Sequence, residues 1–273
     1  MSTRQSLGTA LVTGASSGIG AMYADRLAQR GYDLILVARD EQRLDQLAAR
    51  LRDTTGVTVE VLKADLTVKA DLTRVEQRVR GDESIAMLVN NAGMAVPRQI
   101  VDADPDALEA LVQLNVLAPT RLAATVAPGF IARRRGFIVN ISSVLAVAPE
   151  LTSASYGGSK AYVLNFTLSL HQELSASGVQ VQAVLPGITR TEIWERSGTD
   201  VNSLPAHMIM ETAEMVDAAL VGLDRKELVT IPSLPDPADW DSFNAARLKL
   251  GPNLSHNHAA ARYTTSAGDV AVR

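Results

Sequence analysis

A short apolar run that ends in a glycine-rich turn is the feature that most constrains the fold of this chain. Residues 9–13 are apolar or β-branched, glycines follow at 14, 18 and 20, and residues 18–30 have the pattern of a helix. The start of a helix offers free N–H groups and a positive dipole end to a phosphate. Glycines let the backbone approach the ligand and let the helix pack on the strand. The G-x-x-x-G-x-G spacing also occurs in turns without a ligand, but the flanking strand and helix favour dinucleotide binding.

Strand-like and helix-like segments alternate along the rest of the chain. Apolar runs predict further strands at 33–38, 57–63, 86–90, 136–141, 180–185 and 227–231. Helical patterns lie between them at 41–54, 69–80, 105–132, 156–175 and 211–223. This alternation predicts right-handed βαβ crossovers. We therefore expect a single α/β domain with a doubly wound, mostly parallel seven-stranded sheet and helices on both faces.

Length and composition are those of a globular chain that can bury a large core. The chain has 273 residues, of which 47% are hydrophobic and 21% charged. Its net charge of −4 is not that of a polyanion binder, so we expect no nucleic-acid partner. Cysteine is absent and the four histidines form no zinc pattern, so we expect no metal.

The ends of the chain indicate its organisation. The N-terminus is short and polar, unlike a signal peptide, and no uninterrupted apolar stretch reaches the roughly 20 residues that span a bilayer. We expect a cytoplasmic protein with no membrane partner. Residues 1–232 should form the nucleotide-binding domain, with a substrate lid at about 189–213. Residues 233–273, rich in Pro, Asp, Asn and Ala, should form a C-terminal extension with one helix near 240–250.

The end of the second predicted strand indicates which nucleotide binds. Arg39 lies where dinucleotide folds contact the adenosine ribose. An arginine there suits the 2′-phosphate of NADP, whereas an acidic residue would accept a hydrogen bond from the 2′-hydroxyl of NAD. Arg39 could instead be a solvated charge, and Asp40 could be only the N-cap of the next helix. The sequence favours NADP over NAD.

Tyr156 and Lys160 carry the candidate chemistry. Residues four apart lie on one face of a helix, so the ammonium can lie beside the phenol. A nearby cation favours the phenolate and lowers a tyrosine pKa from about 10 toward the range of a general acid/base. Such a pair is also common on ordinary helix surfaces, so the case for chemistry depends on the surrounding motifs.

Pro119 lies four residues after Asn115 in the predicted helix 105–132. A proline has no N–H to donate to the carbonyl four residues earlier, and its ring clashes with that carbonyl. Either the proline frees the carbonyl of Asn115 for another partner, or it only kinks a long helix.

Over about residues 7–232, these motifs together resemble those of the short-chain dehydrogenase/reductase family. Four residues match the family's catalytic tetrad: Asn115, Ser143, Tyr156 and Lys160. The resemblance implies cofactor contacts at Gly14, Ser16, Ser17, Gly18, Ile19, Gly20, Arg39, Asp65, Leu66, Asn91, Ala92, Gly93, Tyr156, Lys160, Pro186, Gly187 and Thr191. It also implies a Rossmann fold and a homodimer or homotetramer.

The resemblance further implies a role for each catalytic residue. Ser143 would orient the substrate oxygen, and Tyr156 would deliver the proton to an alcohol product or remove it in reverse. Lys160 would lower the tyrosine pKa and bind ribose hydroxyls, while the backbone carbonyl of Asn115 would hold a water. Ser142 and Ser143 point to opposite sides of a strand, and the thirteen-residue interval to Tyr156 favours Ser143. Ser142 is then structural.

The expected function is NADP-dependent hydride transfer between nicotinamide and a carbonyl or secondary alcohol. Six apolar residues form the candidate substrate wall, which favours a hydrophobic small molecule: Val144, Leu145, Leu151, Ile193, Trp194 and Met208. One alternative is a 3-oxoacyl thioester reductase, although the chain after 232 lacks that subgroup's glycine-rich close. Another is isomerase or dehydratase chemistry on the same fold. A catalytically silent NADP-binding regulator is the alternative of another class, and the complete tetrad argues against it.

Overall fold

The computed structural model describes residues 6–96, 99–196 and 200–263. The chain divides into two units, Met1–Ser233 and Leu234–Arg273. The first unit contains every strand and every predicted site residue of the described chain.

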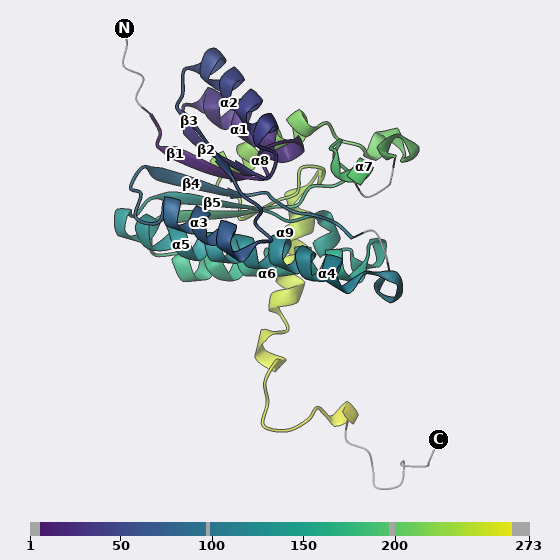
Figure 1. Cartoon of the computed structure of the whole chain (residues 1–273). Coiled ribbons are helices and arrows are strands. Elements are labelled where there is room, and N and C mark those ends of the chain that lie inside the picture. The colour runs from purple at the N-terminus through teal and green to yellow at the C-terminus, as the bar shows by residue number, and fades with distance from the viewer. Residues whose placement is uncertain (1–5, 97–98, 197–199, 264–273) are drawn as a thin grey trace. The chain divides into compact units, whose positions relative to one another are not determined.

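A seven-stranded sheet forms the centre of the first unit (Figure 1). The strands are β1 (Thr9–Thr13), β2 (Asp33–Ala38), β3 (Val59–Lys63), β4 (Ile85–Asn90), β5 (Gly136–Ile141), β6 (Val179–Val184) and β7 (Val229–Thr230). Their order across the sheet is β3-β2-β1-β4-β5-β6-β7, and every neighbouring pair is parallel. The predicted α/β fold class is confirmed. Because the order reverses between β1 and β4, a ligand crevice is expected at the carboxyl ends of these strands.

Helices cover both faces of this sheet. They are α1 (Gly18–Arg30), α2 (Glu41–Thr55), α3 (Lys69–Val79), α4 (Pro105–Val112), α5 (Ala118–Arg133), α6 (Ala154–Leu174), α7 (Ile193–Arg196) and α8 (Thr212–Asp224). The helices α1, α2 and α8 pack on one face, and α3, α5 and α6 on the other (Figure 1). Successive residues of β2 point to opposite faces of the sheet. Leu34 and Leu36 pack in the core under α1, α2 and α8, while Ile35 and Val37 pack in the core under α3, α5 and α6. Burial on both faces explains why the strands are continuously apolar.

The predicted helix 105–132 is not one regular helix. A π-helical turn, Gln113–Leu117, separates α4 from α5, and the N–H of Ala118 donates to the carbonyl of Gln113 five residues earlier. Pro119 follows at the start of α5 and cannot donate to the carbonyl of Asn115. The expectation of a single α-helix is therefore wrong at the turn that holds Asn115.

Among the described residues, the helical run Pro105–Arg133 alone is long and apolar enough to cross a membrane by length and composition. Its apolar residues have another explanation in the fold. Leu122, Val126 and Phe130 are buried in the core that α5 shares with β4 and β5.

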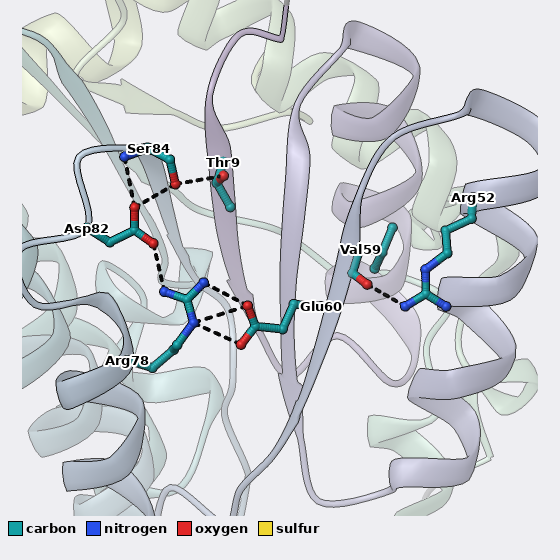
Figure 2. Close-up of polar contacts among 7 residues, drawn as sticks. All are labelled: Thr9, Arg52, Val59, Glu60, Arg78, Asp82 and Ser84. Atoms are coloured by element: carbon teal, nitrogen blue, oxygen red, sulfur yellow. Dashed lines mark hydrogen bonds and ion pairs between the residues drawn. The ribbon is translucent and has the colours of Figure 1, made fainter.

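A polar network fastens the edge of the sheet beside β3 (Figure 2). The guanidinium of Arg78 donates to both carboxylate oxygens of Glu60, at 2.7–3.1 Å, and to Asp82 at 2.7 Å. Asp82 also accepts from the N–H and hydroxyl of Ser84, whose hydroxyl lies 3.1 Å from that of Thr9. The network therefore joins α3, the edge strand and the loop that leads into β4.

The second unit has one α-helix in its described part, α9 (Pro237–Leu248). It begins three residues before the predicted start at 240, because Asp236 caps it by accepting from the N–H of Ala238 and a proline occupies its first turn. The rings of Trp240 and Phe243 contact each other at a centroid distance of 5.5 Å. None of the described residues of this unit is buried.

Candidate active site

The turn between β1 and α1 has the conformation that its glycines predict. Gly14 and Gly18 have φ values of +65° and +53°, in the left-handed region that favours glycine. A Cβ on Gly20 would clash with the carbonyl oxygen of Gly14 and lie 2.5 Å from the side-chain nitrogen of Asn91. The first turn of α1 contains no acidic residue. The turn can therefore accept a phosphate group at the start of the helix.

Thr13 holds the ends of β1 and β4 together beside this turn. Its hydroxyl accepts from the N–H groups of Asn91 and Ala92, at 3.0 Å each, and donates to the carbonyl of Val89. The Asn91 amide donates in return to the carbonyl of Thr13, at 2.9 Å. The sequence predicted Asn91 and Ala92 as site residues but missed Thr13, whose only signal was a hydroxyl directly before the first glycine.

Charged side chains surround the end of β2. Arg39 is 71% exposed, and its guanidinium lies 3.7 Å from Asp65, which also accepts from the N–H and hydroxyl of Thr67. Leu66 is buried beside it. Asp40 accepts from the N–H of Arg43 and is the N-cap of α2, the structural role that the sequence left open. Arg39 is thus exposed where an adenosine ribose would lie.

Helix α6 and the end of β5 bring three of the predicted catalytic residues together. The Lys160 ammonium lies 5.7 Å from the centroid of the Tyr156 ring. The hydroxyl of Ser143, just after β5, lies near the Tyr156 phenol and lowers its pKa. Lys160 also donates to the carbonyl of Ile141 at 3.0 Å, which fixes the ammonium against the end of the same strand.

The two adjacent serines point in different directions. Ser142 donates to the carbonyl of Lys160 at 2.7 Å in a buried contact. Ser143 accepts from the N–H of Leu145 at 3.1 Å and contacts Tyr156. Only Ser143 therefore faces the tyrosine, whereas Ser142 fastens helix α6 to the strand.

Asn115, the fourth member of the predicted tetrad, uses its side chain to join two elements. Its carbonyl oxygen accepts from the N–H of Met94 at 2.9 Å, and its amide donates to the carbonyl of Met94 at 2.9 Å and to the hydroxyl of Ser159 at 3.0 Å. Ser159 in turn donates to the carbonyl of Tyr156 at 2.7 Å. Ser159 was missed from the sequence, although it lies inside the Tyr156–Lys160 motif. A Cβ on Gly93 would lie 3.4 Å from Asn115 and 3.5 Å from Lys160, so the backbone there borders the same site.

Burial governs the proton affinities of the tyrosine and the lysine. Burial raises the pKa of the Tyr156 phenol to about 12, against a smaller lowering by the hydrogen bond with Ser143. Burial also lowers the pKa of the Lys160 ammonium to about 8. Loss of solvation is the larger effect on the Tyr156 pKa, so the predicted lowering of this pKa by Lys160 stays a prediction. Tyr156 therefore keeps its proton at neutral pH.

The predicted lid begins after Pro186 and Gly187. A parallel bridge between Thr189 and Met210 closes the segment at its base. The methyl group of Thr191 would lie 3.2 Å from a Cβ on Gly18, so the start of the lid lies against the glycine turn. The Trp194 indole donates to the carbonyl of Thr189 at 2.8 Å.

The lid is also attached to α2. Arg43 donates to both carboxylate oxygens of Glu192, at 2.8 and 2.6 Å. This hydrogen-bonded contact raises the pKa of Arg43. No sequence pattern indicates this pair, because its members are 149 residues apart and ordinary in type.

The six predicted wall residues differ in exposure. Val144 and Leu145 are half-buried in the short helical turn after Ser143, and Ile193 and Trp194 are half-buried in the lid. Leu151 and Met208 are 72% and 53% exposed. Four of the six residues are therefore partly enclosed, whereas Leu151 and Met208 lie mostly at the surface.

A family model described as short chain dehydrogenase matches residues 8–202. The chain belongs to the short-chain dehydrogenase family. The resemblance and the oxidoreductase class predicted from the sequence are confirmed.

Members of the family with solved structures are similar over almost the whole chain. A short-chain dehydrogenase from Sphingobium yanoikuyae in complex with NADPH is 56% identical, with 94% of this chain and 100% of that chain covered and a TM-score of 0.92. The bulky-bulky ketone specific alcohol dehydrogenase from Comamonas testosteroni is 49% identical, with 96% and 100% covered and a TM-score of 0.89. The very-long-chain 3-oxoacyl-CoA reductase of Podospora anserina is 33% identical, over 92% of this chain and 72% of its own.

Proposed function

We propose that this short-chain dehydrogenase is an NADP(H)-dependent carbonyl reductase and alcohol dehydrogenase, with Tyr156 as general acid/base. The observation that carries the proposal is the contact of the Tyr156 phenol with Ser143, with the Lys160 ammonium 5.7 Å from the tyrosine ring. A phenol that carries a proton, a hydroxyl that orients the substrate and a nearby cation are the groups that reduction of a carbonyl requires.

The residues of the crevice fit a dinucleotide. The glycine turn leaves room for the pyrophosphate, and a Cβ at Gly20 would not fit between Gly14 and Asn91. When bound, the nicotinamide supplies or accepts the hydride. The exposed Arg39 supports NADP(H) over NAD(H), as does the NADPH bound in the 56% identical Sphingobium protein.

Tyr156 donates its proton to the oxygen that becomes the alcohol, and the Ser143 hydroxyl holds that oxygen in place. The pKa of Tyr156, about 12, keeps the phenol protonated at neutral pH, so its proton is available for reduction. In alcohol oxidation the phenol must first lose its proton, and the Lys160 charge stabilises the phenolate that forms. Pro119 has no N–H to donate to the backbone carbonyl of Asn115. This carbonyl is therefore available to a water that passes protons toward Lys160.

The substrate in this proposal is a ketone with large apolar substituents. Val144 and Leu145 lie directly after Ser143, and Trp194 is held in the lid through Thr189. The 49% identical Comamonas protein is specific for bulky-bulky ketones. A 3-oxoacyl thioester is the second candidate, because the Podospora reductase is similar over 92% of this chain.

We further propose that the protein is a homodimer or homotetramer. Tyr162 on α6 is 38% exposed and stacks on Phe166 at 5.9 Å, and Leu117 before α5 is 40% exposed. Apolar groups exposed on two neighbouring helices favour a contact with a second copy.

The proposal is tested by fluorescence titration with NADPH and NADH, followed by a panel of bulky ketones and 3-oxoacyl thioesters. NADPH should bind more tightly than NADH, and Tyr156→Phe should lower turnover about 10²- to 10⁴-fold with unchanged NADPH affinity. A higher kcat/KM for the thioesters would favour the second candidate. Tight NADPH binding without turnover on the whole panel would favour a silent NADP-binding regulator. Failure of both nucleotides to bind would overturn the assignment of the glycine turn.

A further inference from the structure

One ion pair joins the lid to the end of the crevice where the cofactor's adenosine is expected. Arg43 lies in the first turn of α2, four residues after Arg39. Its partner Glu192 directly follows Thr191, the lid residue that lies against Gly18. Arg43 and Glu192 are 45% and 38% exposed, so a solute anion can reach the guanidinium.

The other cations at this edge have partners from the edge itself. Lys63 contacts Glu41 at 3.2 Å, and Arg74 contacts Asp71 at 2.7 Å. Arg39 is 3.7 Å from Asp65, beyond hydrogen-bonding distance. Arg43 also lies 3.4 Å from Asp40 at this edge, but of the four cations it alone has a hydrogen-bonding partner in the lid.

We propose that Arg43 is a second arginine for the 2′-phosphate of NADP(H), and that Glu192 competes with this phosphate for it. Arginine binds a carboxylate and a phosphate with the same forked donors, so the two anions can exchange on one guanidinium. A 2′-phosphate with a charge of about −1.5 to −2 attracts Arg43 more strongly than a single carboxylate and repels Glu192. NADP(H) binding therefore releases the lid from α2, whereas NAD(H) binding leaves the pair intact.

This inference rests on the proposed use of NADP(H) and adds a pair of residues that set the preference between the nucleotides. Arg43 favours NADP(H), and Glu192 opposes it. Removal of the carboxylate should consequently raise the affinity for the phosphorylated nucleotide alone.

The test is titration of Glu192→Gln with NADPH and with NADH. The Kd for NADPH should fall about 2- to 5-fold, the range of an exposed ion pair, while the Kd for NADH stays unchanged. Arg43→Gln should raise the Kd for NADPH alone. In the Arg43→Gln background, Glu192→Gln should have no further effect on the Kd for NADPH, because the two residues act on one contact.

Glu211→Gln is the matched control. Glu211 accepts from Arg190 at 2.8 Å, so this variant removes a carboxylate near the base of the lid and leaves Arg43 with its partner. The ratio of the two affinities should not change. A second readout is amide exchange in residues 200–212, which should be faster with saturating NADP⁺ than with saturating NAD⁺, and equal for both nucleotides in Glu192→Gln.

Equal shifts of the NADPH and NADH affinities in Glu192→Gln would overturn the inference, as would an effect that persists without Arg43. If wild-type protein binds NADPH and Glu192→Gln does not change the affinity ratio, only this inference fails. If wild-type protein binds neither nucleotide, the proposed function fails first.

Discussion

At the scale of single residues, the site consists of a tyrosine that keeps its proton and a lysine that gives one up easily. Burial moves the pKa of Tyr156 up to about 12 and that of Lys160 down to about 8. The group that titrates near physiological pH is therefore the lysine. As pH rises from neutral, the reaction rate should therefore respond first to loss of the Lys160 proton and only at higher pH to loss of the Tyr156 proton.

We expect kcat/KM for ketone reduction to be constant below pH 8 and to fall as pH rises through about 8, where Lys160 loses its charge. Lys160→Arg should lack this fall, because a guanidinium stays charged throughout the range. The measurement is kcat/KM between pH 6 and 10 for both proteins. A fall that remains near pH 8 in the arginine variant would assign it to another group.

The same lysine affects stability with a defined sign. Its folded pKa lies below its unfolded value of 10.5, so between pH 8 and 10.5 the unfolded chain binds more protons than the folded one. The lysine's contribution to the free energy of unfolding therefore rises with pH in this window and is lost as pH falls through it. The Tyr156 phenol has the opposite effect between its ordinary pKa of 10.0 and about 12, where its contribution to the free energy of unfolding falls as pH rises.

The adjacent serines provide a matched pair of variants. Ser143→Ala should lower kcat about 10²- to 10³-fold, as loss of a donor to the reacting oxygen does, with little change in stability. Ser142→Ala removes a buried hydrogen bond to the Lys160 carbonyl and should cost about 1 kcal/mol of unfolding free energy. Urea unfolding and steady-state kinetics on both variants separate the roles. A larger kinetic loss in Ser142→Ala would reverse the assignment.

At the scale of elements, the π-helical turn before α5 is the feature that local pattern could not predict. Apolar periodicity over 105–132 is continuous, and a proline alone does not predict a π-helical turn, since Pro128 lies inside the regular part of α5. The type of interruption depends on contacts made elsewhere, because Asn115 bonds to Met94 after β4 and to Ser159 on α6. Pro119 is compatible with the π-helical turn, and the hydrogen bonds of Asn115 to Met94 and Ser159 are formed from this turn.

Pro119→Ala should slow the proton-coupled step of the reaction, since the alanine N–H can donate to the carbonyl of Asn115 and displace its water. Affinity for NADPH should not change. The turnover rate and its solvent isotope effect measure the proton-coupled step, and titration with NADPH measures the affinity.

Pro128→Ala is the control for this prediction. Pro128 also lies inside α5 but is exposed, away from Asn115, so its replacement should leave turnover unchanged. Unaltered turnover in Pro119→Ala would refute a role for the freed carbonyl.

At the scale of the whole molecule, the sequence predicted the sheet, both helical layers and the main residues of the crevice. Strand positions followed from apolar runs that lie between two cores, and boundaries moved by only a few residues, as where β3 begins at Val59 rather than 57. The proximity of Tyr156 and Lys160 was predictable because they are one helical turn apart, and the surrounding motifs marked them as the candidate site. Thr13, Ser159 and the Arg43–Glu192 pair were not predictable, because their roles depend on partners distant in sequence or on backbone groups.

The candidate catalytic and nucleotide-binding residues all lie at the carboxyl ends of the parallel strands, which has a consequence for protein engineering. The loops at the opposite end of the strands lead from helices back into strands and include the turns at Gly56 and Gly81, which have open space around them and whose φ of +73° requires that the glycines themselves be kept. Both turns precede strands whose far ends reach the crevice. They are therefore the places to graft an affinity tag, a fluorescent reporter or a second enzyme while the catalytic edge stays open to its reactants.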